Sequence, residues 1–362
     1  MSGTPTEGLK QFVTVRPFLL KQEKMRWVLF GANGWIGQMV HTYILHLGDT
    51  VVPITQPLHH QAPSQILSIL QTHQPDRVFI ALGRAYIPSH RRPPTWKAGG
   101  ITGTIDDLEV PEALELNVRD NLYLPIVIAD CCRQAGIHCT YLGTGCIYEY
   151  DEEHPDGFTE TDEPNYTGSS YSTMKGYTDR LMGTLFEESC LTLRIRMPIT
   201  GDLHPRNFLT KMIRYQTIVS VPNSMSVLPE LLPIAISLAR EKQTTGRLNL
   251  TNPGVISHQE ILQLMAEEWK LPMNDGYYTI TTEESSIQHT LRARRSNNHL
   301  NTTRLEQLNP EVLPIQSSLR LLLKASPRPT AEQLHSLRCL ARLARQEAEP
   351  SAKTPETDSR TD

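Results

Sequence analysis

The sequence lacks several features that would place it in a special class of protein. No apolar run approaches the roughly 18 residues needed to cross a bilayer, and the first residues lack the apolar core of a signal peptide. The six cysteines form no C-x-x-C pair and are too sparse for a disulfide framework, which favours reduced thiols. No basic stripe is present, and the formal net charge is -4. We therefore expect a cytoplasmic protein that binds neither nucleic acid nor a membrane.

The rest of the composition is ordinary. Thirteen histidines are present, but they form no Cys/His/Asp cluster at ligand spacing, so we expect no metal site. Hydrophobic residues make up 39% and charged residues 20% of the chain, which is typical of a globular enzyme. A chain of 362 residues is long enough for one large α/β unit or two modest domains.

Strand and helix patterns alternate along the first half of the chain. A strand is predicted at Arg26–Phe30, and apolar residues at helical spacing predict a helix over 35–47. After residue 111 the alternation resumes with another helix, predicted near 112–135. Further strands are predicted at 51–54, 77–82, 138–142 and 191–197. This alternation favours right-handed βαβ units, and hence an α/β fold with a Rossmann-type doubly wound parallel sheet.

The patterns divide the chain into four parts. We expect a flexible leader at 1–24, a Rossmann domain at 25–197 and a smaller substrate-binding lobe at 198–325, some of whose elements return to the core. A C-terminal amphipathic helix and a disordered tail are expected within 326–362. Residues 83–111 interrupt the alternation with a Pro/Gly/Arg-rich stretch of a length usual for functional or variable loops.

A glycine-rich turn joins the first predicted strand to the first predicted helix. Glycines permit a tight turn and let the backbone approach a pyrophosphate, while the helix offers free N–H groups at its start. The strand–turn–helix context makes this pattern more specific than the glycines alone. The residues expected to bind a dinucleotide here are Gly31, Asn33, Gly34, Trp35, Ile36 and Gly37.

The residues after the second strand bear on the choice between NADH and NADPH. An NAD site usually has an acid there that holds the ribose 2′-hydroxyl. The segment VVPITQPLHHQ contains none, and Asp49 precedes the strand. A 2′-phosphate would meet no repulsion, and His59 or His60 could contact it, although no arginine marks the position. We therefore expect NADPH, with NADH tolerated.

Three residues suggest chemistry at a carbonyl group. Tyr171 and Lys175 are four residues apart and hence on one helix face. A nearby ammonium lowers the pKa of a phenol, which suits proton delivery to an alkoxide, and both side chains are expected to contact the cofactor. Thr144 ends a predicted strand, and its hydroxyl could polarise the same carbonyl. The Tyr/Lys spacing alone also occurs on solvated helix faces, but the glycine turn and Thr144 favour a reductase.

In this order and spacing the motifs resemble the extended short-chain dehydrogenase/reductases. Longer blocks, including LGTGCIYEYD (142–151), EPNYTGSSYSTMKG (163–176) and RIRMPITGDLHPRNFLTK (194–211), resemble more narrowly the bifunctional nucleotide-4-keto-6-deoxyglucose 3,5-epimerase/4-reductases. This resemblance implies a UDP- or dTDP-4-keto-6-deoxy-D-glucose substrate, reduction by NADPH and a nucleotide-L-rhamnose product. It also implies a homodimer formed through helices.

The resemblance further assigns Cys146 and Lys211 to proton exchange at C3 and C5. Inversion beside a ketone needs a base and a proton donor, and a thiol and a lysine of shifted pKa can supply both. Cys146 lies two residues after Thr144, so in an extended segment both side chains would point the same way. The residues that the resemblance places around the nucleotide-sugar are Arg206, Asn207, Arg295 and Asn297.

Three other functions fit part of these observations. A 4-keto-reductase alone would need only the Tyr171, Lys175 and Thr144 group, with Cys146 as a buried apolar residue. A GDP-fucose-type epimerase/reductase would pair a similarly placed cysteine with a histidine, whereas Lys211 takes that position here. A non-catalytic NADP-binding regulatory subunit would carry a broken Tyr/Lys pair, and this pair is intact.

Overall fold

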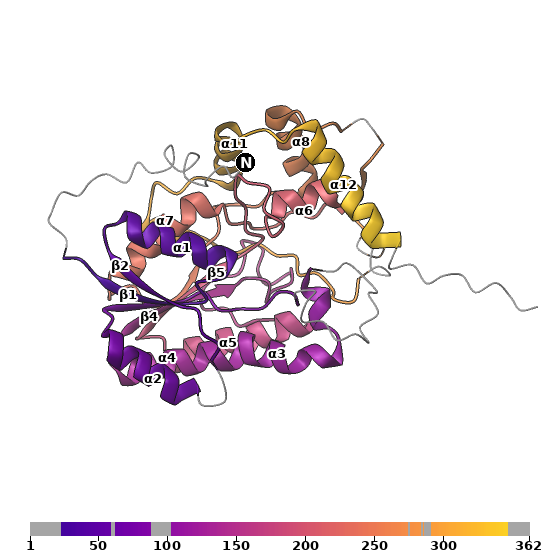
Figure 1. Ribbon diagram of the computed structural model, residues 1–362. Helices are drawn as coiled ribbons and strands as arrows, with labels where there is room; N and C mark the ends of the chain where they lie inside the picture. Colours follow the sequence, from indigo (N-terminus) through magenta and orange to yellow (C-terminus); the bar gives the residue numbers. More distant parts are fainter. Residues whose placement is uncertain are drawn as a thin grey trace, which may run out of the picture.

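The computed structural model describes residues 23–58, 62–87, 103–273, 276–283, 285 and 291–346. The expected leader up to residue 22, His59 and His60, residues 88–102 of the Pro/Gly/Arg-rich segment, and the tail from 347 lie outside the described residues. The described part is built on a parallel sheet with helices on both faces, and a second group of helices lies at one end of it (Figure 1).

The predicted doubly wound parallel sheet is confirmed. Each predicted strand is found to within two residues at either end, and each neighbouring pair is parallel. The sheet has the order β2-β1-β3-β4-β5-β7, so the order reverses between β1 and β3, where ligands of such sheets bind beyond the carboxyl ends of the strands. The strands are β1 (Arg26–Phe30), β2 (Thr50–Ile54), β3 (Arg77–Ile80), β4 (His138–Thr144), β5 (Cys190–Ile195) and β7 (Gly246–Asn249).

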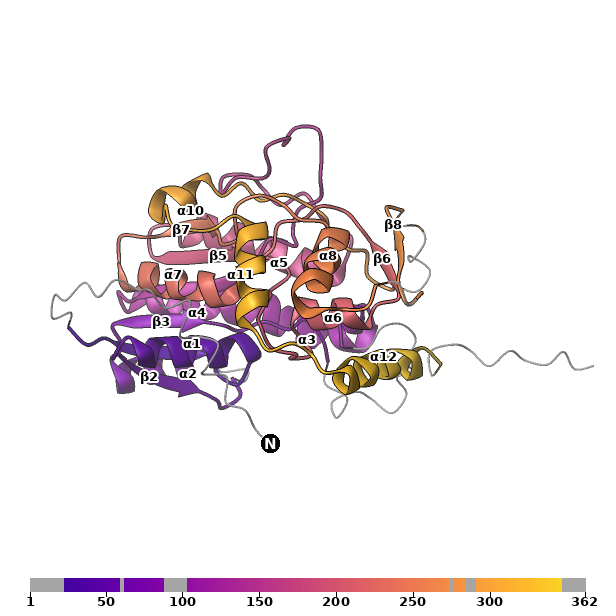
Figure 2. The ribbon, with the colours of Figure 1, turned by 90° about the horizontal axis from the view of Figure 1, so that it is seen from above.

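Helices cover both faces of the sheet (Figures 1 and 2). One face carries α1 (Trp35–His46) and α7 (Leu228–Arg240); the other carries α2 (Ala62–His73), α4 (Leu124–Gln134) and α5 (Ser170–Leu185). The helix predicted over 35–47 is α1. Its apolar residues face the sheet: Val40 and Ile44 are fully buried and join Leu29 of β1 in one hydrophobic core. Burial of this apolar stripe stabilises α1 on the sheet.

The helix predicted over 112–135 is found over 114–134, but a π-helical turn interrupts it. A short 3₁₀ turn (Pro111–Ala113), α3 (Leu114–Val118) and a π-helical turn (Arg119–Tyr123) precede α4. Pro125 has no N–H to donate to the carbonyl four residues earlier, which belongs to Asn121. The hydroxyl of Thr178 on α5 donates to that carbonyl instead, at 2.5 Å. Apolar periodicity did not reveal this interruption, although the proline could have indicated it.

A second hydrophobic core lies beyond the sheet. It is formed by α6 (Phe208–Arg214), α8 (His258–Trp269) and α11 (Ile315–Ala325). The expected amphipathic C-terminal helix is present as α12 (Ala331–Gln346), which packs on α6 through Leu334 and Leu337 (Figure 2). Among the described helices, none combines the length and the apolar character that a membrane span requires.

Three short elements complete the described part. A two-stranded parallel sheet forms from β6 (Thr217–Val219) and β8 (Thr279–Thr281), and α10 (Thr303–Leu308) lies near β7. Because α7 and β7 belong to the layers of the main sheet, the segment 198–325 contributes to both cores.

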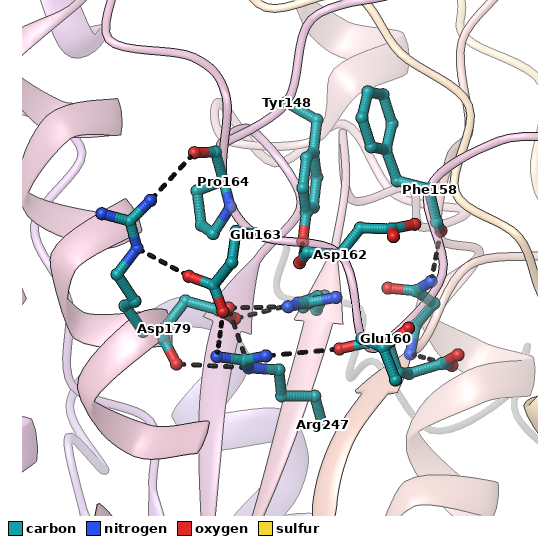
Figure 3. Close-up of polar contacts among 12 residues, drawn as sticks. Tyr148, Phe158, Glu160, Asp162, Glu163, Pro164, Asp179 and Arg247 are labelled. Carbon is teal, nitrogen blue, oxygen red and sulfur yellow. Dashed lines mark hydrogen bonds and ion pairs between the residues drawn. The ribbon is translucent and has the colours of Figure 1, made fainter. Parts of the chain in front are cut away.

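Ion pairs fix the long loop between β4 and α5 (Figure 3). Asp179 of α5 pairs with Arg194 of β5 at 2.7 Å and with Arg247 of β7 at 3.2 Å. Arg247 also reaches the carboxylate of Glu163 in the loop at 3.3 Å, and the Glu160 carboxylate accepts the backbone N–H of residue 249 at 3.0 Å. The loop that follows Thr144 and leads to Tyr171 is therefore held against two strands.

Candidate active site

The glycine turn lies where the strand order reverses. Gly31 has a φ of 83°, and a Cβ there would lie 2.6 Å from the carbonyl oxygen of Ala81, which follows β3. At Gly37 a Cβ would lie 2.1 Å from the carbonyl oxygen of Gly31. Side chains at these positions would push apart the turn, the helix and the neighbouring strand. The turn therefore has the close backbone packing that a dinucleotide cradle requires.

The start of α1 is open to an anion. Gly34 is the N-cap, and within the described residues no side chain caps the helix and no acid lies in its first turn. The N–H groups of Trp35 and Ile36 belong to this turn, and Asn33 is exposed beside it. Because such N–H groups and the helix dipole favour negative charge, the turn fits the pyrophosphate of a dinucleotide.

The Trp35 ring connects this turn to the second core. It stacks on His204, which precedes α6, with ring centroids 4.9 Å apart and the planes 1° from parallel. Burial lowers the pKa of His204, which favours the neutral ring in this stack. The cofactor turn and the segment that leads to Lys211 are thus in direct contact.

Asp49, the acid nearest to β2 in the sequence, lies at the end of the strand opposite to the glycine turn. Asp49 precedes the amino end of β2, where it accepts a hydrogen bond from the Trp27 indole at 2.9 Å and pairs with Arg240 at 3.0 Å. Residues 50–58, which run past the carboxyl end, contain neither Asp nor Glu. His59 and His60, expected beside a 2′-phosphate, lie outside the described residues.

Thr144, Cys146 and Tyr171 meet beyond the carboxyl end of β4. Thr144 is the last residue of the strand, and its hydroxyl oxygen accepts the backbone N–H of Cys146 at 3.1 Å. Tyr171 lies in the first turn of α5, whose start is capped by the Ser169 hydroxyl, which accepts the backbone N–H of Ser172 at 3.0 Å. A side-chain hydrogen bond links Tyr171 to Thr144, and Cys146 is near enough to act on the Tyr171 phenol electrostatically.

The pKa of Tyr171 is raised, whereas the sequence predicted that Lys175 would lower it. Burial, and then the charge of Cys146, raise this pKa above its usual value, while the hydrogen bond with Thr144 lowers it by less. The expected lowering by Lys175 is not observed, because the Lys175 ammonium is directed elsewhere. The phenol is therefore protonated at neutral pH, which is the form that can donate a proton.

The Lys175 ammonium donates to the hydroxyl of Tyr141, at 2.8 Å. Tyr141 lies on β4 and is almost completely buried. Burial lowers the pKa of Lys175 to about 7, and the nearby carboxylate of Asp120 opposes that shift. Sequence reasoning missed Tyr141, because a tyrosine within a buried strand has the pattern of an ordinary core residue.

Lys211 of α6 lies close enough to Cys146 for the two side chains to interact electrostatically. Burial lowers its pKa to about 8, with smaller lowering from the cations Arg295 and Arg206, while Cys146 raises it. Lys211 and Cys146 therefore interact although 65 residues separate them in the sequence. An amine of this pKa exchanges protons near neutral pH, unlike an ordinary surface lysine.

Arg206 and Arg295 add positive charge beside Lys211. Arg206 is exposed, lies over the Tyr86 ring at 4.6 Å from its centroid and donates to the Tyr86 hydroxyl. Arg295 pairs with the buried carboxylate of Asp106 and remains partly exposed. Both guanidinium groups act on Lys211, so three cations gather here. Such a cluster fits an anionic ligand such as a diphosphate.

The two asparagines expected around the nucleotide-sugar lie differently. Asn207 is fully buried, and its side chain caps α6 by accepting the backbone N–H of Leu209 at 3.1 Å. Its amide also donates to the Thr200 carbonyl at 2.8 Å. Asn207 therefore positions α6, and its contact with the substrate stays a prediction. Asn297 is half-buried, and its side-chain oxygen accepts a hydrogen bond from Asn223 at 2.8 Å.

Comparison with known proteins agrees with this geometry. Residues 27–215 match the NAD dependent epimerase/dehydratase family, and this range contains the glycine turn, Thr144, Tyr171 and Lys211. The chain belongs to that family. As a member of the NAD dependent epimerase/dehydratase family it is an enzyme that uses NAD(P), which confirms the cofactor class predicted from the glycine turn.

Individual relatives indicate to which members of the family this chain is similar. The crystal structure of the L780 UDP-rhamnose synthase from Acanthamoeba polyphaga mimivirus is similar at 41% identity and a TM-score of 0.75, covering 84% of this chain and 100% of that one. A bifunctional dTDP-4-dehydrorhamnose 3,5-epimerase/dTDP-4-dehydrorhamnose reductase of Arabidopsis thaliana is 36% identical over 81% of this chain and 90% of its own. These relatives confirm the resemblance to nucleotide-rhamnose synthases.

A more distant structure supports the fold alone. The dTDP-4-dehydrorhamnose reductase of Bacillus anthracis, solved in complex with NADP, shares 16% identity with a TM-score of 0.65, covering 84% of this chain and 99% of that one.

Proposed function

We propose that this enzyme converts UDP- or dTDP-4-keto-6-deoxy-D-glucose to the nucleotide-L-rhamnose, by 3,5-epimerisation followed by reduction at C4. The observation that carries the proposal is the convergence of Tyr171 and Thr144 with Cys146 and Lys211. The first pair suits a carbonyl reduction, and the second suits proton exchange beside the same carbonyl. Arg206 and Arg295 would hold the diphosphate, and the segment 198–325 would form most of the substrate-binding lobe.

In the epimerisation, a base removes the hydrogen from C3 or C5 and the electron pair moves onto the C4 oxygen. We assign the base to the thiolate of Cys146 and the donor, which returns a proton to the opposite face, to the ammonium of Lys211. The developing charge on the oxygen is stabilised by the hydroxyls of Thr144 and Tyr171, which act as preorganised hydrogen-bond donors. Once a proton has passed from the thiol back to the amine, directly or through solvent, the same pair of residues serves the second carbon.

In the reduction, Tyr171 gives its proton to the C4 oxygen and Thr144 holds that oxygen in place. A bound NADPH would supply the hydride. The raised pKa of Tyr171 keeps its proton available at neutral pH, and the transfer becomes favourable only as the oxygen takes on alkoxide character. Lys175, which also lies at this site, would bind the cofactor and carry part of the positive charge.

We propose NADPH rather than NADH as the preferred cofactor. Residues 50–58 offer no carboxylate to a ribose 2′-hydroxyl, and Asp49 is held at the other end of β2 by Trp27 and Arg240. Without a negative side chain, a 2′-phosphate meets no repulsion.

The direct test is incubation with UDP- and dTDP-4-keto-6-deoxyglucose and NADPH, with NMR identification of the product sugar. The expected product is the L-rhamnose nucleotide. A product that keeps the gluco configuration at C3 and C5 would favour a 4-keto-reductase alone. NADPH binding without any oxidation would favour a regulatory subunit.

Epimerisation should depend on pH through Lys211. Its pKa of about 8 means that the ammonium prevails at neutral pH and is lost as the pH rises through 8. With NADP⁺ in place of NADPH, we expect the initial rate of C3 and C5 inversion, divided by the rate of Lys211→Met, to decline across that range. Lys211→Met should itself be slower than the wild type by roughly tenfold or more at neutral pH. The exposed Lys324→Met is the control, and a ratio that does not fall through pH 8 would contradict the donor assignment.

We further propose that the enzyme is a homodimer that packs through α5. Tyr177, Leu181 and Leu185 form an exposed apolar row at four-residue spacing, with 53%, 37% and 53% of their surfaces exposed. Such a row on a helix suits a self-complementary interface. Leu181→Glu should give a monomer by light scattering, whereas Leu67→Glu on α2 should not. A wild-type monomer at micromolar concentration would refute this proposal.

A further inference from the structure

Arg196 is a fully buried arginine immediately after β5, beside the segment that carries Cys146. Its guanidinium donates to the backbone carbonyls of Gly145 (3.2 Å), Ser224 (3.3 Å) and Ser296 (3.0 Å) and to the Ser296 hydroxyl (2.9 Å). It also donates to the side-chain oxygen of Asn223. These acceptors are neutral, so hydrogen bonding satisfies the donors of Arg196 but leaves its charge unbalanced.

Within the described ranges, no ion pair includes Arg196. Arg194, two residues earlier on the same strand, is equally buried but makes two hydrogen bonds, at 2.9 and 2.7 Å, to the carboxylate of Asp179, which Figure 3 labels. A buried charge without a partner is costly, because the protein interior replaces water poorly. Arg194 has a carboxylate partner and Arg196 does not. This contrast indicates that Arg196 faces a group that becomes negative only in one of its protonation states.

The acids that act on Arg196 are Cys146, Tyr150 and Tyr166, with Cys146 the first among them. The phenols carry charge only at high pH, and burial raises the pKa of Tyr150 further. Cys146 is partly exposed and also interacts with Tyr171 and Lys211. Of the three acids, Cys146 is the one whose conjugate base the proposed epimerisation uses.

We propose that Arg196 is the counter-ion of the Cys146 thiolate and so prepares this residue to act as the base of the epimerisation. The inference deepens the proposed function and rests on it. The thiolate takes a proton from C3 or C5 while the electron pair moves to the C4 oxygen, and Arg196 stabilises the negative sulfur before that step. Arg196 is a positioning residue, because it acts through Cys146 and not on the sugar.

The test measures the reactivity of the thiol apart from turnover. Carbamidomethylation of Cys146 by iodoacetamide is followed by mass spectrometry at about pH 7, where alkylation requires the thiolate. Arg196→Met and Arg196→Gln should be alkylated about tenfold more slowly, as expected for the loss of one nearby charge. Arg196→Lys, which keeps the charge but loses the fork of donors, should recover most of the rate.

Two controls separate the charge from the fold. Ser296→Ala removes one acceptor but no charge and should stay within about twofold of the wild type. The deficit of Arg196→Gln should shrink at about pH 10, since hydroxide then forms the thiolate unaided. Circular dichroism and NADPH binding report whether each variant is folded, and the Lys and Gln pair remains informative if the Met variant is not.

The possible outcomes test the role of Arg196 separately from the proposed epimerase/reductase function. Equal alkylation rates in the wild type, Arg196→Gln and Arg196→Lys would overturn the role of Arg196, even if the wild type epimerises the keto-sugar. A Lys variant as slow as the Gln variant would likewise overturn it and indicate a structural role. A charge-dependent rate together with no exchange at C3 and C5 in the wild type would support the thiolate pair and refute the proposed function.

Discussion

Tyr171→Phe is expected to slow keto-sugar-dependent NADPH oxidation by roughly 10²- to 10⁴-fold, the usual contribution of general acid catalysis. The substitution removes the hydroxyl that is hydrogen-bonded with Thr144 and leaves the ring in its apolar contacts with residues such as Ile87 and Leu108. Stopped-flow absorbance at the NADPH band measures the loss. Entry of solvent deuterium at C3 and C5 should persist at a reduced rate, because Cys146 and Lys211 are unchanged and Thr144 still donates to the C4 oxygen.

Tyr177→Phe is the matched control for this experiment. It removes the same hydroxyl from the same helix, but at a position with 53% of its surface exposed. Its oxidation rate should match that of the wild type. A Tyr171→Phe enzyme that keeps more than about a tenth of the wild-type rate would remove this residue from the role of proton donor.

Cys146→Ser should abolish the entry of solvent deuterium at C3 and C5, with a fall of at least about a hundredfold. A serine hydroxyl is far less acidic than a thiol, so it forms no useful base even beside Arg196 and Lys211. Deuterium incorporation is measured by NMR in D₂O with NADP⁺ present. Reduction of a nucleotide-4-keto-L-rhamnose prepared separately should continue, since Tyr171 and Thr144 remain.

Cys339→Ser provides the control, because Cys339 lies on α12 and is partly exposed. That variant should exchange deuterium at the wild-type rate. Continued exchange in Cys146→Ser would support the reductase-only alternative and would place the base elsewhere.

The features that local sequence patterns could predict are those set by short-range geometry. The close packing around Gly31 and Gly37 requires glycine, and so the turn was visible in the sequence. The alternation of strands and helices defined the sheet, and Thr144 was expected at the end of β4, where it lies. The Tyr/Lys spacing also placed Tyr171 and Lys175 on one helix, α5.

The features that were missed depend on contacts between distant segments. No local pattern reveals that Lys175 donates to Tyr141 or that burial outweighs the ammonium in setting the Tyr171 pKa. The capping of α6 by the Asn207 side chain likewise becomes visible only in the fold. Arg196 differs from Arg194 only in what faces it, which the fold determines.

The stacked rings of Trp35 and His204 have a consequence for redesign of this enzyme. Residues of the glycine turn, including Trp35, would be varied in a redesign of the cofactor site of this enzyme. A smaller side chain in place of Trp35 would also remove the surface on which His204 rests, seven residues before Lys211. A change at Trp35 would therefore reach both the cofactor turn and the segment that leads to Lys211, and libraries that vary one ring should vary both at once.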